Sequence, residues 1–135
     1  MNIVFRTDAS AQIGIGHVMR CLALAETLQN EGVSIKFICR KSVGNKKHYI
    51  SKKGFQVIEL LSINEKQDAN DTILCLNNLC PEWIIVDHYE LGKKWEDLVR
   101  PHVRNIMVID DLANRDHNCD LLLNQNWFKN SEKRY

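Results

Sequence analysis

Residues 3–39, IVFRTDASAQIGIGHVMRCLALAETLQNEGVSIKFIC, hold two short apolar segments separated by a glycine-containing loop and an amphipathic segment. Ile3–Thr7 and Ser34–Cys39 are rich in β-branched and aromatic residues, which favours β-strands. Between them, apolar residues recur at the spacing of one helix face, at Val18, Cys21, Leu22, Ala25 and Leu28. Gly32 follows as a helix stop. Two strands joined by a helix are typical of a parallel crossover.

The same alternation continues along the rest of the chain. Further strands are expected at Gln56–Leu60, Trp83–Asp87, Asn105–Asp110 and, more weakly, Asp120–Asn124. Helices are expected at residues 45–53, along a stripe from Ala69 to Cys80 that stops before Pro81, and at Lys93–Arg100, stopping at Pro101. The repeated order of strand and helix predicts a Rossmann-like α/β domain, a parallel sheet with flanking helices on both faces.

Length and composition fit one globular domain, with 135 residues, 44% of them hydrophobic and 26% charged. A formal net charge of +1 provides no broad field for nucleic acid or an anionic membrane, so we expect neither as a partner. The five cysteines are an odd number without a C-x-x-C pair, which favours buried, reduced thiols. No apolar run approaches the ~18 residues of a membrane span. We therefore expect a cytoplasmic protein.

Polar residues follow almost every predicted strand. Ligands of parallel α/β sheets bind beyond the carboxyl ends of the strands, so these residues are candidates for a site. They are the loop Asp8–His17, then Arg40, Asp87–Tyr89, Asp110–Asp111, Asn114–Arg115 and Gln125–Asn126. Any single one of these residues is explained by the exposure of turns to solvent, which favours polar residues. The whole set together favours a binding site.

The loop after the first strand carries the strongest local signal. Gly14 and Gly16 permit a close backbone approach, and the following helix directs free N–H groups toward an anion or a polarised oxygen. A dinucleotide fingerprint would need glycine in place of Met19, and no G-K-[ST] follows, so neither an NAD site nor a Walker loop is expected. His17 lies at the helix N-terminus, whose dipole keeps the imidazole neutral and suits a general base. The alternative is a first-turn residue that only packs against the loop.

Metal and signalling functions receive less support. No zinc-binding spacing is present. Asp8, Asp87 and Asp110–Asp111 could converge around Mg²⁺, but for Asp87 and Asp110 we favour hydrogen bonds that shape neighbouring loops. A receiver domain has this length and alternation, yet its paired acids follow the first strand, whereas here the pair follows the fifth. We predict no metal and no cofactor.

Three blocks in order along the chain carry a family resemblance. They are FRTDAS with IGIGHVMRCL within residues 5–22, IVDHY at 85–89, and DDLANR with CDLLLNQN within 110–126. The blocks resemble the PseG family, UDP-2,4-diacetamido-2,4,6-trideoxy-β-L-altropyranose hydrolases of pseudaminic acid biosynthesis, close to spore-coat polysaccharide proteins. The resemblance implies a GT-B-type (MurG-like) architecture of two Rossmann-like domains. Residues 1–128 would form the N-terminal domain, and 129–135 would lead toward a C-terminal nucleotide-binding domain outside this chain.

The resemblance also implies an activity and a set of residues. The reaction would be metal-independent hydrolysis of a UDP-sugar to free sugar and UDP, with this chain alone inactive. His17 would be the catalytic base, and Tyr89 would orient water or a sugar acetamide. Substrate contacts would come from Asp8, Ser10, Gly14, Gly16, Arg20, Asp87, His88 and Asn126. A GT-B glycosyltransferase that passes the sugar to a hydroxyl, and a non-catalytic receiver-like domain, remain alternatives.

Overall fold

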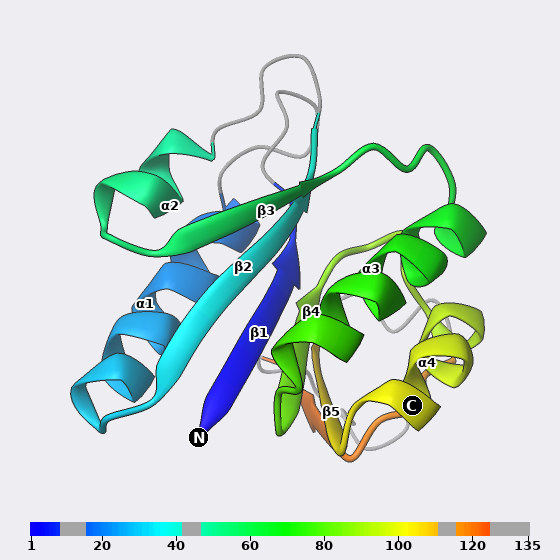
Figure 1. The fold of residues 1–135 in the computed structure, drawn as a ribbon. Helices are drawn as coiled ribbons and strands as arrows, with labels where there is room; N and C mark the ends of the chain where they lie inside the picture. Colours follow the sequence, from blue (N-terminus) through cyan, green and yellow to red (C-terminus); the bar gives the residue numbers. More distant parts are fainter. Residues whose placement is uncertain (9–15, 42–46, 111–115, 125–135) are drawn as a thin grey trace.

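A computed structural model describes residues 1–8, 16–41, 47–110 and 116–124. Within them, six parallel strands form one sheet in the order β3-β2-β1-β4-β5-β6, with helices on both faces (Figure 1). The elements are β1 Asn2–Thr7, α1 Gly16–Asn30, β2 Ser34–Arg40, α2 His48–Lys52, β3 Gln56–Leu60, α3 Glu65–Leu79, β4 Trp83–Asp87, α4 Lys93–Val99, the 3₁₀ turn η1 Arg100–His102, β5 Asn105–Ile109 and β6 Leu121–Leu123. This arrangement confirms the predicted Rossmann-like sheet.

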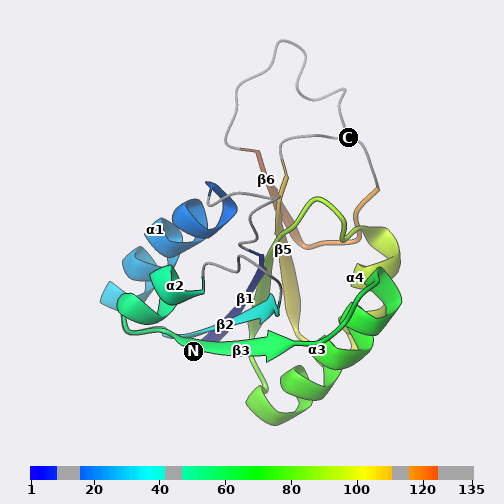
Figure 2. The ribbon, with the colours of Figure 1, turned by 90° about the horizontal axis from the view of Figure 1, so that it is seen from above.

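The strand order reverses at the centre of the sheet. From β1 the chain proceeds outward through β2 to β3, then returns to place β4 on the other side of β1. Figure 2 shows the consequence, with α1 and α2 on one face and α3 and α4 on the other. Right-handed crossovers that run in opposite directions place their helices on opposite faces. The carboxyl ends of β1 and β4 therefore form the topological switch point, where such sheets bind ligands.

Strand side chains alternate between two cores. Ile3 and Phe5 of β1 pack with α1 and α2, whereas Val4 packs with α3 and α4 around the fully buried Trp95. Burial of each large apolar side chain contributes about 1.5–3 kcal/mol. The alternation also directs Arg6, which follows Phe5, toward the α3 face.

Three predicted helix boundaries differ from the observed ones. α3 begins four residues before Ala69, because Asn64 caps its N-terminus and accepts a hydrogen bond from the Gln67 N–H at 2.8 Å. α2 is shorter than residues 45–53, and positions 45–46 lie outside the described residues. α4 ends at Val99, one residue before the predicted end at Arg100, and the chain continues through Pro101 as the 3₁₀ turn η1. Proline is tolerated there because the first turn of a helix needs no N–H donor.

The cysteines are free thiols in unlike environments. Cys21 and Cys39 are buried, and burial raises the pKa of Cys39 to about 12. Cys75 and Cys119 are partly buried. The expectation of a buried thiol was wrong for Cys80, which is exposed at the C-terminus of α3 with a left-handed φ of 48°. Among the helices that the structure describes, none has the length and apolar content needed to cross a bilayer.

Removal of the α3 cap tests the observed helix start. Asn64→Ala is expected to lower the free energy of unfolding by about 1 kcal/mol, because the N–H of Gln67 loses its acceptor. Chemical denaturation followed by circular dichroism measures the difference. Asn70→Ala, an exposed position inside the same helix, is the matched control and should leave stability unchanged or slightly higher. Equal effects of the two substitutions would contradict the assigned cap.

Candidate functional site

A carboxylate, an imidazole and a guanidinium meet at the carboxyl end of β4. Asp87, the last residue of that strand, is buried and faces the first turns of α1. His17 contacts Oδ1 of Asp87 through Nδ1. Arg20, one turn further along α1, donates to both carboxylate oxygens through Nε and Nη2, each at 2.5 Å. Positions i and i+3 share one helix face, so α1 presents both side chains to the same carboxylate.

Asp87 is held in its charged form. Burial alone would raise its pKa, but the hydrogen bonds from Arg20 and His17 outweigh burial and lower it. The carboxylate therefore accepts the Nδ1 proton of His17 and leaves Nε2 as the basic nitrogen of the neutral ring.

Tyr89 completes this group from the turn after β4. Its ring meets the His17 ring edge-on, with centroids 4.3 Å apart and planes at 79°. The tyrosine is 38% exposed, whereas the histidine is buried. The pair therefore joins a basic nitrogen to a phenol that reaches the surface, an arrangement suited to holding a water molecule or a sugar substituent.

A second carboxylate site lies at the end of β1. Asp8 accepts hydrogen bonds from Nη1 of Arg6 at 2.7 Å, the backbone N–H of Arg40 at 2.7 Å and Nε2 of His88 at 2.6 Å. Burial would raise the pKa of Asp8, but the Arg6 charge and the His88 hydrogen bond lower it overall. The carboxylate thereby links the ends of β1, β2 and β4.

Asp68, on the first turn of α3, is the anchor beneath this site. Its carboxylate accepts from Arg6, from Nε of Arg40 at 2.7 Å and from the indole N–H of Trp95 at 2.9 Å. Asp68 was not among the predicted site residues, because an aspartate in the first turn of a helix is ordinarily explained by its favourable interaction with the helix dipole. Arg6 was an available signal, since an arginine inside an apolar central strand requires an acidic partner.

A third polar cluster was also missed. Glu96 of α4 is fully buried and contacts Nδ1 of His117 at 2.7 Å, while Nε2 of that histidine lies 3.3 Å from Asp110. Glu96 also accepts from the backbone N–H of Asn118. The cluster fastens residues 116–118 to α4. Its members are separated by up to 22 residues, so no local motif marks it.

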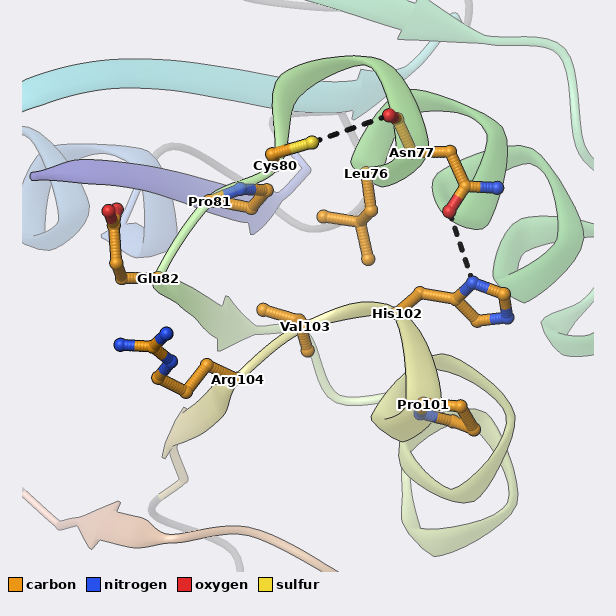
Figure 3. A pocket seen from close by; sticks show the side chains of 9 residues that line it. All are labelled: Leu76, Asn77, Cys80, Pro81, Glu82, Pro101, His102, Val103 and Arg104. Atoms are coloured by element: carbon orange, nitrogen blue, oxygen red, sulfur yellow. Dashed lines mark hydrogen bonds between the residues drawn. The ribbon is translucent and has the colours of Figure 1, made fainter.

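A cavity lined by described residues lies at a distance from these side chains. This cavity of about 550 Å³ is lined by Glu82 and Arg104, just before β4 and β5, and by the end of α3 (Figure 3). In it, Nδ1 of His102 lies 3.1 Å from the side-chain oxygen of Asn77. This cavity opens at the edge of the sheet opposite the carboxyl ends, away from His17.

Comparison with known proteins connects this geometry to a family. The chain is 32% identical over 131 residues, 93% of its length, to a UDP-2,4-diacetamido-2,4,6-trideoxy-beta-L-altropyranose hydrolase of Campylobacter jejuni. The chain is a PseG-like domain. It spans 42% of the length of that relative and matches its N-terminal domain.

A second relative of the PseG-like domain is an uncharacterised protein of Methanocaldococcus jannaschii. The two are 28% identical over 111 residues, covering 82% of the chain and 22% of that protein. No protein-family model matches the chain.

The PseG-like domain brings most of the predicted site residues together. Two groups occupy neighbouring strand ends, one formed by His17, Arg20, Asp87 and Tyr89, the other by Asp8 and His88. Gly16 begins α1, and a Cβ added there would meet no atom of the described residues within 4 Å, so packing among those residues does not require glycine at this position. The predicted Ser10, Gly14 and Asn126 lie outside the described residues.

The strand-end carboxylates of the PseG-like domain are occupied by nitrogen donors. Asp8 and Asp87 are each bonded to an arginine and a histidine, and Asp110 faces His117. Within the ranges that the structure describes, no three potential metal ligands are grouped to hold an ion. The contacts of Asp87 and Asp110 with these nitrogen atoms agree with the loop-shaping role expected of the two residues.

Proposed function

We propose that this domain supplies the water-activating half of an enzyme that hydrolyses a UDP-linked 2,4-diacetamido-2,4,6-trideoxy sugar in pseudaminic acid biosynthesis. The main support for this proposal is the contact of His17 with Asp87 at the topological switch point of the sheet. The printed activity of the Campylobacter relative supports the substrate class. Because the chain spans only part of that relative, UDP contacts are assigned to a further domain of the full-length protein.

In the proposed reaction, water attacks the anomeric carbon of the sugar. Nε2 of His17 takes a proton from the water, and Asp87 stabilises the resulting imidazolium through Nδ1–H. The bond between the anomeric carbon and the phosphate oxygen breaks, and UDP leaves with the electron pair. UDP needs little acid assistance, because its charge is spread over phosphate oxygens. Tyr89 adjoins the base and orients the water or an acetamido group.

Metal independence is part of the proposal. A catalytic Mg²⁺ would need carboxylate ligands at the strand ends, where Asp8 and Asp87 are already paired with arginines and hydrogen-bonded to histidines. Recruitment of these carboxylates by a cation would break those contacts. The proposed role of the two aspartates is therefore to hold protein groups.

UDP release by the full-length protein tests the function. The sugar product is identified by NMR, with and without EDTA and with and without hydroxyl acceptors. We expect free sugar and UDP in equal amounts, without an acceptor and with EDTA present. Release that requires an acceptor would instead identify a glycosyltransferase, and release abolished by EDTA would contradict metal independence. The 135-residue chain alone is expected to be inactive.

A further inference from the structure

The turn that carries Tyr89 is fastened by its buried neighbour. His88 is 3% exposed, and Nδ1 of its ring accepts a hydrogen bond from the backbone N–H of Glu90 at 3.1 Å. Its Nε2 lies 2.6 Å from Oδ2 of Asp8. Since Nδ1 is an acceptor, the proton of the neutral ring is on Nε2 and is donated to Asp8. Nδ1 of the ring thus closes the turn through Glu90, and Nε2 fastens the turn to Asp8.

Asp8, the residue that Nε2 of His88 contacts, is itself fixed by further hydrogen bonds. Asp8 is held by Arg6 of β1 and by the backbone N–H of Arg40 at the end of β2. Arg6 in turn is fixed by Asp68 of α3. His88 is therefore tied through Asp8 to the ends of β1 and β2, and it transmits their position to the turn after β4.

Tyr89 lies between the two ends of this turn. Its ring contacts the ring of His17, which Asp87 holds through Nδ1. We propose that His88 is a positioning residue for hydrolysis, which locks the 88–90 turn so that Tyr89 stays against His17. The proposal rests on the function proposed above. It differs from the expectation that His88 binds substrate, because both ring nitrogens already face protein atoms.

Two substitutions separate the two hydrogen bonds of His88. In His88→Asn the amide oxygen occupies the place of Nδ1 and still accepts from Glu90, whereas contact with Asp8 is lost. In His88→Gln the amide reaches toward Asp8, but the acceptor next to the Glu90 N–H is displaced. We expect the second variant of the full-length protein to lose kcat by about 10-fold to 10²-fold, with KM changed by less than about 3-fold. His88→Asn should lose less.

A structural readout accompanies the kinetics. At this ring separation we expect the Tyr89 ring current to shift the protons of the His17 ring, and selective histidine labelling lets NMR report the contact without any turnover. Loss of kcat that follows loss of this shift across the two variants supports the proposal. A rise in KM at constant kcat would overturn it in favour of substrate contact, as would a fall in kcat with the ring contact intact.

Matched controls are His102→Asn and His102→Gln, at the opposite edge of the sheet, which should leave kcat and the ring shift unchanged. Circular dichroism verifies that each variant is folded. If the wild-type protein hydrolyses no UDP-sugar, the proposed function fails, while an unchanged ring shift in His88→Gln would reject the turn lock by itself.

Discussion

His17→Ala in the full-length protein is expected to lower the rate of UDP release by about 10²-fold to 10⁴-fold, the usual contribution of a general base. The residue is buried against Asp87 through Nδ1, so its loss removes the basic Nε2 and leaves the carboxylate paired with Arg20. Because that salt bridge remains, the domain should still fold. Release of UDP is measured at saturating substrate, with the free sugar quantified by NMR.

Two comparisons separate chemistry from structure. His17→Asn retains a group that contacts Asp87 but lacks the basic nitrogen, so it should be nearly as slow as His17→Ala. Asp87→Asn should also be slow, and the double variant should be about as slow as His17→Ala alone, because the two residues act as a unit. His102→Ala is the control and should retain full activity. Wild-type rates in the His17 variants would refute the assigned base.

Asp68→Ala is expected to lower the free energy of unfolding by about 3–5 kcal/mol, the range for removing one partner of a buried ion pair. Arg6 is fully buried, and two of its hydrogen bonds go to this carboxylate. The substitution also leaves the indole N–H of Trp95 without its acceptor. Urea denaturation measures the loss. Asp71→Ala, one turn further along the same helix, should change stability by less than about 0.5 kcal/mol.

The pH dependence of stability provides a second test of Asp68. Burial would raise its pKa, but hydrogen bonds and charges from Arg6 and Arg40 lower it below the unfolded value of about 3.9. The stabilisation is therefore complete above the unfolded pKa and is lost as the pH falls toward the folded pKa. Between about pH 5 and pH 3, wild-type protein should lose more stability than Asp68→Asn. Parallel curves for the two proteins would show that this carboxylate is not linked to folding.

Most of the fold could be predicted because its determinants are local. The strand Gln56–Leu60 and the strand Trp83–Asp87 are observed at the predicted residues, and β6 falls within the weakly predicted Asp120–Asn124. A short apolar segment bounded by turn residues needs no distant partner to be recognised. The errors lie at ends, such as the start of α3, where a single hydrogen bond to Asn64 decides the boundary.

The candidate site was only partly predictable. The positions of His17 and Asp87 at the carboxyl edge followed from the parallel order of strands, and the structure joins them by a direct contact. Asp8 and His88 were predicted to contact substrate. The hydrogen bond that joins them to each other could not be predicted, because 80 positions of sequence separate the two residues. Likewise, the buried contacts of Glu96 with His117 have no counterpart in sequence spacing.

The alternation of strands and helices, the parallel sheet and the edge at which polar groups gather can all be read from the amino-acid sequence, because backbone periodicity and turn residues act over short distances. The pairing of each buried charge with its partner depends instead on how the helices pack on the sheet. Arg6 could have paired with any acid at that edge, yet packing of α3 places Asp68 beside it. A buried guanidinium requires an acidic partner, but burial alone does not determine which acid this is. The partner depends on where the helices pack against the sheet.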